Sequence, residues 1–495
     1  MTERVPAAGS LAGAPDRARR AAPPRTGAEH LSEYCARLSW DALDASVRTR
    51  TKELLLDHIG VAIGGLAMES TRAIHAFLGR VSRVGAASVI GRRDGAAAEW
   101  AALANGTAAH AIEMDDCTRE SSLHPGVAVI PAAMAVAEEA QAGSAAFLEA
   151  VVAGYEVTMR VGAALNPGSA YARGFHPTGV AGVFGAAMAA GRILGLDPGR
   201  LTSALGIAGT MSSGSLEYLT DGAWTKRLTP GWAAHGGVVA AKLAAADFVG
   251  PATVFEGPLG FLRAYSDAAQ PDRLLDGLGA VPPRIMRVAI KPYACCRYVH
   301  GIVDGVLELR RRHGVGPRDV TGIELGVLSI ATSLVSDPIE RKRHPRSVVD
   351  AQFSAPYAAA VALTRGRAGM DEFSVENLYD PDIRRLMEAT HCHTDPALDL
   401  AFPEAMPATV TLILTDGRQL ETRVDYPAGE PESPLSREEI LARFIDLASP
   451  LLAHDEARAF GSQILDLDGD QATRSVMAAL RTVPVGNGHA AEDMG

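Results

Sequence analysis

The segment NGTAAHAIEMDDCTRESSLHPGVAVIP, residues 105–131, places two histidines, two aspartates, two glutamates and an arginine between two apolar runs. The apolar run at 102–112 predicts a helix of small residues, on which His110 and Glu113 share a face because they lie three positions apart. The His-Pro-Gly sequence predicts a turn, and a second helix is expected at 127–140. A polar loop between buried helices is a common location for catalytic side chains. The alternative is a solvated connector.

Composition limits the classes of protein to which this chain can belong. Its length of 495 residues predicts two or three domains. The chain is 47% hydrophobic but only 5% aromatic, which predicts closely packed helices with small residues at their contacts. The net charge of −11 is spread along the chain without a basic block, so we expect no nucleic-acid partner. No apolar run reaches the ~18 residues of a membrane span, and we expect no membrane partner. Five unevenly spaced cysteines indicate a reducing compartment and therefore a cytoplasmic protein.

Hydrophobic periodicity predicts helices in the first half of the chain. Residues 51–64 have helical apolar spacing, and residues 145–165 follow a serine suited to capping. In the run 174–196, glycines and alanines recur every three or four residues, which permits close helix packing. Asp197-Pro198 is a typical start for the helix at 199–210. Residues 212–231 look irregular, and helix is expected again at 232–249.

Near residue 280 the sequence pattern changes from helical spacing to a mixture of strands and helices. Strands are predicted at 286–291 and 323–331, with a helix at 301–313 between them, and a hairpin joins 408–415 to 419–425 around Asp416-Gly417. A capping box of Ser436 and Glu439 then starts a further helical section.

These patterns predict a mainly α fold: a large all-helical domain with a smaller inserted α/β domain that acts as a lid. The expected parts are a disordered N-terminal extension at 1–27, the first part of the large domain at 28–279, the lid at 280–430, a helical return at 431–483 and a frayed tail at 484–495.

Two candidate acid–base or binding residues lie in the large domain. His176 precedes a proline at a predicted helix start, where backbone N–H groups favour an anion; it could act as an acid or base beside a carboxylate, or it could simply cap the helix. Lys226 lies in the irregular segment and could pair with a substrate carboxylate. Its alternative is an ordinary surface lysine.

The segment KPYACCRYVHG, residues 291–301, carries the candidates of the lid. Arg297 offers bidentate recognition of a carboxylate, and Tyr298 and His300 offer proton transfer. The adjacent cysteines lack the spacing of a zinc or redox site. The run His391-Cys392-His393 has no further metal ligand nearby in the sequence, so no metal site is predicted.

Six segments in order resemble one family. They are LLLDHIGVAIGG, NGTAAHAIEMDD with its HPG turn, GYEV, GFHPTGVAG, WTKRLTPGWAAHGG and KPYACCRYVHG. Together they resemble the MmgE/PrpD family, which includes 2-methylcitrate dehydratase, cis-aconitate decarboxylase and an iminodisuccinate epimerase, and the likeness extends from about 30 to 480. It implies a homodimer, no metal, no organic cofactor, and a site between the domains for small di- or tricarboxylates.

The resemblance also implies site residues. The family's catalytic histidines and lysine match His124, His176, Lys226 and His300. Substrate contacts are expected from Glu113, Asp116, Thr118, Arg297 and Tyr298.

The chain also departs from the family pattern. In cis-aconitate decarboxylase an aspartate stands where this chain has Glu113, and its loop threonine corresponds here to Cys117 or Thr118, because the loop before His124 is one residue longer. Its lid motif lacks the Cys-Cys-Arg-Tyr run.

We therefore expect a lyase that removes a proton α to a carboxylate, with 2-methylcitrate-like dehydration preferred. The enzymatic alternatives are an epimerase and a decarboxylase of the cis-aconitate type. A helical binding protein that has lost the chemistry is the non-enzymatic alternative. His110 and Asp115-Asp116 also suggest a rival, a metal-dependent phosphohydrolase of the HD type.

Overall fold

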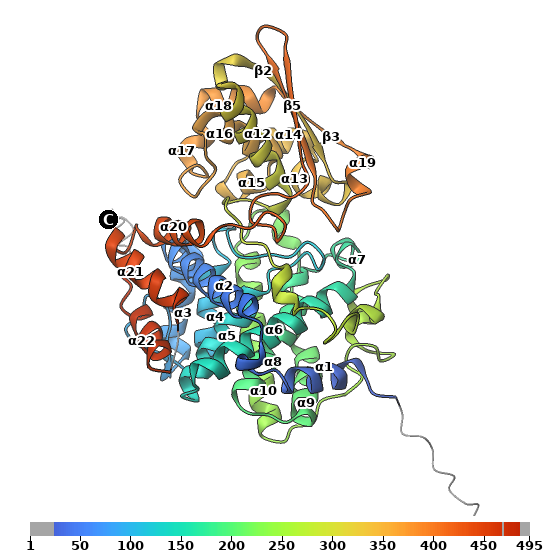
Figure 1. The fold of residues 1–495 in the computed structure, drawn as a ribbon, viewed down its shortest axis with the longest axis vertical. Coiled ribbons are helices and arrows are strands. Elements are labelled where there is room, and N and C mark those ends of the chain that lie inside the picture. The colour runs from blue at the N-terminus through green and yellow to red at the C-terminus, as the bar shows by residue number, and fades with distance from the viewer. Residues whose placement is uncertain (1–23, 468–469, 486–495) are drawn as a thin grey trace, which may run out of the picture.

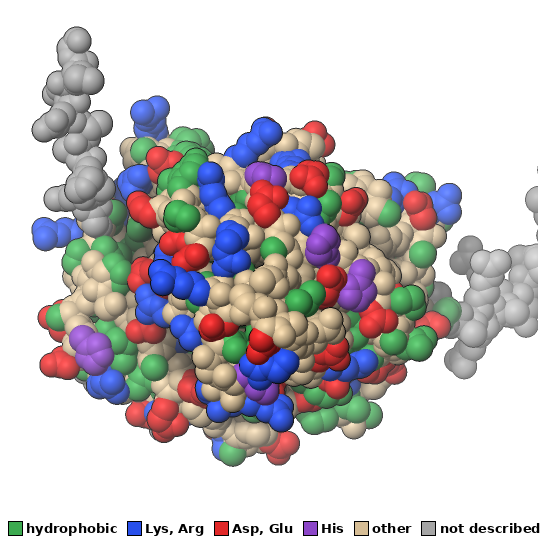
Figure 2. Space-filling model, turned by 90° about the horizontal axis from the view of Figure 1, so that it is seen from above, with side chains coloured by type: hydrophobic (Ala, Val, Ile, Leu, Met, Phe, Trp, Pro, Cys, Tyr) green, Lys and Arg blue, Asp and Glu red, His purple; other side chains and the backbone are tan. Residues whose placement is uncertain are grey.

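The computed structural model describes residues 24–467 and 470–485 as a helical body with a smaller α/β unit stacked on one end (Figure 1). This confirms the predicted fold class. Most of the expected N-terminal extension and tail lies outside the described residues. Among the described residues, no helix is long and apolar enough to cross a membrane. Where Figure 2 looks onto the α/β unit, acidic and basic side chains are interspersed.

The helical body uses both ends of the chain. Its N-terminal elements are α1 (Gly27–Ala36), α2 (Ala45–Gly64), α3 (Glu69–Val81), β1 (Val84–Ala87), α4 (Ala98–Ala109), α5 (Gly126–Glu139), α6 (Ser144–Leu165), α7 (Pro167–Ala172), α8 (Pro177–Ile193), α9 (Pro198–Met211), α10 (Thr225–Ala245) and α11 (Phe261–Tyr265). Its C-terminal elements are α20 (Arg437–Ala448), α21 (His454–Leu465) and α22 (Asp470–Leu480). The capping box of Ser436 and Glu439 starts α20 as predicted, and α20 packs against α2.

Small residues let the central helices α6, α8 and α10 approach closely, as the glycine pattern predicted. A Cβ atom at Gly185 of α8 would collide with Thr158 and with the backbone of Gly154, both on α6. A Cβ at Gly237 of α10 would collide with Ala186 of α8. The body core therefore depends on backbone-to-backbone contact, and larger residues at these positions would force the helices apart.

The smaller unit surrounds a sheet with the strand order β3-β2-β4-β5. Strand β2 runs antiparallel to β4 and parallel to β3, and β4 and β5 form the predicted hairpin. Helix α12 packs on β4 and β5, and α16 packs on α12. The elements are α12 (His300–His313), β2 (Val320–Val327), α13 (Thr332–Val335), α14 (Ile339–Arg343), α15 (Val348–Gln352), α16 (Ala355–Arg365), α17 (Val375–Leu378), α18 (Pro381–Glu388), β3 (Thr390–Thr394), α19 (Pro396–Asp399), β4 (Ala408–Leu414) and β5 (Gln419–Val424).

Three expected elements differ from the structure. The strand predicted at 286–291 is wrong: Arg284–Arg287 forms a 3₁₀ turn, and the following backbone pairs with the polar loop only at the bridge between Cys117 and Ala289. Strand β2 ends at Val327, before another 3₁₀ turn at Ser329–Ala331. Helix α10 begins at Thr225 instead of near 232. Alternating hydrophobicity marked burial at 286–291 but could not reveal that the segment has no strand as a neighbour.

Candidate active site

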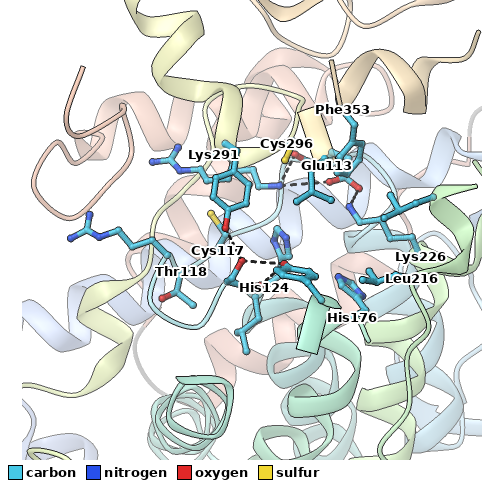
Figure 3. Close-up of a pocket in the computed structure, with 18 of the residues that line it drawn as sticks. Glu113, Cys117, Thr118, His124, His176, Leu216, Lys226, Lys291, Cys296 and Phe353 are labelled. Carbon is cyan, nitrogen blue, oxygen red and sulfur yellow. Dashed lines mark hydrogen bonds and ion pairs between the residues drawn. The ribbon is translucent and has the colours of Figure 1, made fainter. Parts of the chain in front are cut away.

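A cavity lies where the helical body meets the α/β unit, and it gathers most of the predicted site residues. Seven of them line it: Glu113, Thr118, His124, His176, Lys226, Arg297 and Tyr298. Figure 3 shows Lys226 and Lys291 approaching Glu113 from opposite sides, with His124 and His176 near each other on the wall below. The other two predicted residues, Asp116 and His300, do not line the cavity.

Glu113 reaches the cavity because helix α4 ends early. The helix stops at Ala109 with His110 as its C-cap, so the predicted helical face shared by His110 and Glu113 is wrong. Glu113 instead has a φ angle of 60°. Residues other than glycine adopt this conformation only at an energetic cost, and such residues are found most often at functional sites.

The Glu113 carboxylate is held by two lysines. Lys226 forms an ion pair with one oxygen, and Nζ of Lys291 lies 3.9 Å from the other and donates to the Glu113 carbonyl at 3.0 Å. Burial opposes ionisation of this carboxyl, but the lysines outweigh it and lower the pKa of Glu113 to about 2. Glu113 is therefore ionised at neutral pH, and Lys291 also lies 4.0 Å from Oδ1 of Asp115, so the two lysines face two carboxylates.

Lys226 is buried in the first turn of α10, with Nζ 4.7 Å from the centre of the Phe353 ring. The surface alternative for this lysine is thus incorrect.

Pro230, inside α10, changes the hydrogen bonding of the first turn. Pro230 has no N–H to donate to the carbonyl of Lys226 four residues earlier, and the Thr229 hydroxyl donates to that carbonyl instead, at 3.0 Å.

This proline also determines the tautomer of His176, the N-cap residue of α8. Nδ1 of His176 lies 2.8 Å from Oγ1 of Thr229. The Thr229 hydroxyl has one proton, so both contacts are hydrogen bonds only if it donates to the Lys226 carbonyl and accepts from His176. Nδ1 therefore carries the proton, and Nε2 keeps its lone pair. Burial, with nearby His110 and Lys226, holds the pKa of His176 well below its usual range, so this imidazole is a neutral base.

His124 is oriented in a similar way by different partners. Its Nδ1 lies 2.8 Å from the backbone carbonyl of Asp116 and 3.0 Å from Oδ2 of Asp115. Both are acceptors, so Nδ1 carries a proton and Nε2 is left for the substrate. The same Asp115 oxygen accepts from Nδ1 of His110 at 2.7 Å. Burial opposes ionisation of Asp115, yet His110, His124 and Lys291 hold its pKa well below the usual range.

The two cavity histidines thus share a tautomer but differ in charge environment. His124 lies beside an ionised carboxylate, with which a protonated imidazolium can pair, whereas His176 lies beside a neutral hydroxyl. Paired groups with contrasting environments are the usual arrangement for an acid and a base in one site.

The trio His110, Asp115 and His124 also offers three ligand atoms within 4.8 Å of one another, which bears on the metal-dependent rival. Histidine and carboxylate suit several divalent metals. Here, however, both Nδ1 atoms lie at hydrogen-bonding distance from one oxygen, and Nδ1 of His124 also faces a carbonyl. A metal ion would need a lone pair on each of these Nδ1 atoms, whereas the hydrogen bonds need a proton on each. The trio therefore fits a hydrogen-bonded cluster better than a metal site.

The structure places Asp116 and His300 outside the cavity, each with its polar atoms occupied. Asp116 accepts from the Tyr155 hydroxyl at 2.6 Å and from the backbone N–H of Gly126 at 3.0 Å. His300 accepts from Arg297 at 2.9 Å and donates to the Cys295 carbonyl at 3.2 Å. A substrate contact by Asp116 is therefore not supported, and a catalytic role of His300 stays a prediction that the resemblance supplies.

Arg297 lines the cavity, but its guanidinium is largely occupied. Glu430 accepts from Nη2 at 2.6 Å and from Nε at 3.0 Å, and the Ala428 carbonyl accepts from Nη1 at 3.1 Å. This pairing ties the start of α12 to the linker before α20. Arg297 therefore positions the cavity wall, and a free bidentate grip on substrate is not supported. Tyr298 contacts the Ser122 hydroxyl at 3.2 Å, and the Thr118 hydroxyl is buried without a partner among the described residues.

Sequence reasoning missed two contributors, Lys291 and Thr229, and considered a third, Asp115, only for the metal-dependent alternative. Asp115 and Lys291 stood in segments already singled out, so their residue types were visible, but only the fold shows that they meet. Thr229 gave no signal, because its role depends on the missing N–H of the proline that follows it.

A buried pair of oriented histidines lies beside two lysines, at the junction of a helical body and an α/β unit, and this arrangement suits acid–base chemistry on a small anion. The chain belongs to the MmgE/PrpD family. The N-terminal domain of that family matches residues 29–274, and its C-terminal domain matches residues 293–468.

Several relatives are similar over nearly their whole length. A cis-aconitate decarboxylase of Aspergillus terreus is 28% identical over 463 residues, covering 88% of this chain and 92% of the relative. The cis-aconitate decarboxylase-like protein oryM of Aspergillus oryzae is 26% identical, with 91% and 96% covered. The human cis-aconitate decarboxylase is 26% identical, with 88% and 90% covered.

Proposed function

We propose that this chain is a lyase acting on a small tricarboxylate, and that the reaction is a decarboxylation of the cis-aconitate type. The observation that carries this proposal is the pair His124 and His176, each held by a hydrogen bond at Nδ1, in one cavity with Lys226 and Lys291. The named relatives support decarboxylation over the 2-methylcitrate dehydration that the sequence favoured.

The chemistry requires a carbanion next to a carboxylate. In a β,γ-unsaturated acid such as cis-aconitate, the bond to one carboxylate breaks and carbon dioxide leaves. The electron pair spreads over the allylic carbons and the adjacent carboxylate, and a proton then adds to the α-carbon while the double bond shifts. Each turnover releases one carbon dioxide and takes up one proton.

The lysines supply the electrostatic part of this reaction. Lys226 and Lys291 pair with Glu113, and Lys291 also lies 4.0 Å from Asp115, so both ammonium groups are fixed in the cavity wall. In a buried cavity, such fixed cations stabilise developing negative charge far better than water does. A substrate carboxylate between these lysines would bring the delocalised charge next to them.

The histidines supply the proton. His124 lies beside the ionised Asp115, which can pair with its doubly protonated form, and we assign it as the acid: its Nε2 takes up a proton from solvent and delivers that proton to the α-carbon. His176 is neutral and accepts hydrogen bonds through Nε2, which suits it to hold a protonated group of the substrate or to take up a proton. General acid–base groups of this kind contribute about 10²–10⁴-fold to a rate.

Dehydration of a 2-methylcitrate-like hydroxy acid is the second candidate, and the contrast between the two histidines favours it. Dehydration needs a base for the α-proton and an acid for the leaving hydroxyl at the same time. His176 and His124 would fill these roles, with the same lysines stabilising the same type of carbanion.

Substrate turnover separates the two candidates. The purified protein is incubated separately with cis-aconitate and 2-methylcitrate, and carbon dioxide and products are followed by gas analysis and NMR. We expect carbon dioxide from cis-aconitate, at a rate that is at least about 10²-fold lower in an Asp115→Asn control. Water loss from 2-methylcitrate without any release of carbon dioxide would instead establish the dehydratase. Inertness towards both acids would refute the proposal.

We also propose that the protein is a homodimer, as the resemblance implies. Sedimentation velocity at micromolar concentration should give the mass of two chains, and a monomer would refute this part of the proposal.

A further inference from the structure

A second cavity adjoins the histidine cavity, and we call it the second chamber. It lies between α10 of the body and the segment from α13 to α15 of the smaller unit. The two cavities share six lining residues: Glu113, Tyr218, Leu219, Lys226, Leu334 and Phe353. The ion pair of Lys226 and Glu113 therefore forms part of the boundary between them, and Lys226 faces both spaces.

Beyond the shared boundary, the second chamber has an excess of basic side chains. Arg227, Arg341 and Lys342 line it, with Asp337 and Asp350 as acids. Arg341 has a partial counter-ion, since Asp350 lies 3.8 Å away. Asp337 is exposed to solvent. Arg227 and Lys342 are the cations of the chamber without a carboxylate partner within ion-pair distance among the residues that the structure describes.

Arg227 follows Lys226 in the first turn of α10. It is half-buried, and its Nη1 donates to the Ser70 hydroxyl at 3.2 Å. Burial lowers the pKa of Arg227, although Glu113 and Glu69 act in the opposite direction. Because no carboxylate of the described residues pairs with Arg227, N–H groups of its guanidinium can bind a planar anion. The fork-like geometry of a guanidinium fits a carboxylate.

Lys342 comes from α14 of the smaller unit. It is also half-buried, and its ammonium donates to the backbone carbonyls of Leu334 and Phe353, the latter at 2.9 Å. Burial lowers the pKa of Lys342 as well. Carbonyls satisfy the hydrogen bonds of the ammonium without neutralising its charge, so positive charge from both units converges on this chamber.

We propose that the second chamber is an anion subsite, in which Arg227 and Lys342 bind a distal carboxylate of the same substrate whose reacting end lies between His124 and His176. One molecule can extend across both spaces because they meet at Lys226. Since Arg227 belongs to the body and Lys342 to the smaller unit, a carboxylate between them also links the two units. The inference rests on the proposed tricarboxylate substrate and adds a residue set that selects for the third carboxylate.

Binding of unreactive acids tests this subsite without turnover. Isothermal titration calorimetry is used with tricarballylate, which has three carboxylates, and succinate, which has two. Arg227→Met should weaken tricarballylate binding at least tenfold and succinate binding less than threefold, and Lys342→Met should show the same selectivity. Arg227→Lys should recover part of the loss. The matched control is Arg93→Met, which removes the same charge from an exposed position on the body.

Two results would overturn the subsite. One is equal weakening of both acids by Arg227→Met, which would indicate general attraction of anions. The other is unchanged tricarballylate affinity together with loss of inorganic phosphate binding, which would mean that the chamber holds a separate anion. Selective binding in a protein that turns over neither cis-aconitate nor 2-methylcitrate would refute the proposed reaction and leave the subsite standing.

Discussion

Oδ2 of Asp115 lies 3.0 Å from Nδ1 of His124, so an ionised, buried carboxylate orients the imidazole that we assign as the acid. Replacing Asp115 with asparagine keeps the shape but removes the charge and one acceptor. We expect Asp115→Asn to lower kcat about 10²-fold or more, the usual scale for disabling a general acid or base, with a smaller change in KM. Steady-state kinetics with cis-aconitate measure this. An unchanged kcat would remove Asp115 from the chemistry.

Thr229 is expected to act through the tautomer of His176. Thr229→Val removes the acceptor for Nδ1–H, so the His176 proton is free to move to Nε2, the atom that the substrate needs as a base. We expect roughly a tenfold loss of kcat and a changed tautomer signature of His176 in ¹⁵N NMR. Thr229→Ser keeps the hydroxyl and should restore both. A normal NMR signature in Thr229→Val would show that the tautomer is fixed in another way.

Lys226→Met should affect both catalysis and stability, because it breaks a buried ion pair. We expect kcat/KM to fall well over tenfold, about 1.4 kcal/mol for each decade. We also expect a loss of about 3 kcal/mol in unfolding free energy, the low end for breaking a buried pair, because Lys291 still lies 3.9 Å from Glu113.

The double variant Lys226→Met/Glu113→Gln separates these two effects. It should recover stability, as urea unfolding would show, but not activity. Stability that stays low in the double variant would contradict the pairing, and unchanged kcat/KM in the single variant would place Lys226 outside the site.

Asp116 should make the free energy of unfolding decrease as pH rises, which is opposite to the effect of most carboxylates. Burial, with nearby Asp57 and Asp115, raises its pKa to about 8 in the folded state, from 3.8. The native state then binds more protons than the unfolded state. The contribution of Asp116 is therefore complete below pH 3.8 and is lost as pH rises through 8.

Asp116→Asn removes this titration and gives the matched comparison. The unfolding free energy of the natural protein minus that of Asp116→Asn should fall by at least about 1 kcal/mol between pH 5 and pH 8, since one pKa unit corresponds to about 1.4 kcal/mol. Urea unfolding at the two pH values measures the difference. A difference independent of pH would show that Asp116 is ionised in the fold.

The elements that the sequence predicted best are those with a local cause. Asp197 caps α9, Ser436 and Glu439 start α20, and Asp416-Gly417 joins β4 to β5. Each depends on residues a few positions apart. The helix α10 was predicted to start too late because the segment 212–231 looked polar and irregular. In the structure the helix contains Pro230 in its second turn, and the Thr229 hydroxyl donates to the carbonyl that the proline leaves free.

The candidate site was predictable in its residue types but less so in its contacts. The motifs around His124, His176 and Lys226 indicated the residues that meet in one cavity. They could not show that Lys226 is neutralised by Glu113, that Arg297 is held by Glu430, or that both nitrogens of His300 are occupied. Glu113 and Lys226 lie far apart in the chain, as do Arg297 and Glu430, so only the fold brings them together. The contacts of His300 are local, but they depend on the exact turn between Cys295 and His300, which residue types do not reveal.

Solvent isotope incorporation tests the proposed chemistry most directly. The natural protein is incubated with cis-aconitate in D₂O, and the product is analysed by NMR and mass spectrometry. If His124 delivers a solvent-derived proton to a carbanion, each product molecule should contain one deuterium at a single α-position, with one carbon dioxide released, and His124→Gln should slow both together. Carbon dioxide release without deuterium in the product, or full incorporation at an undiminished rate in His124→Gln, would contradict this mechanism.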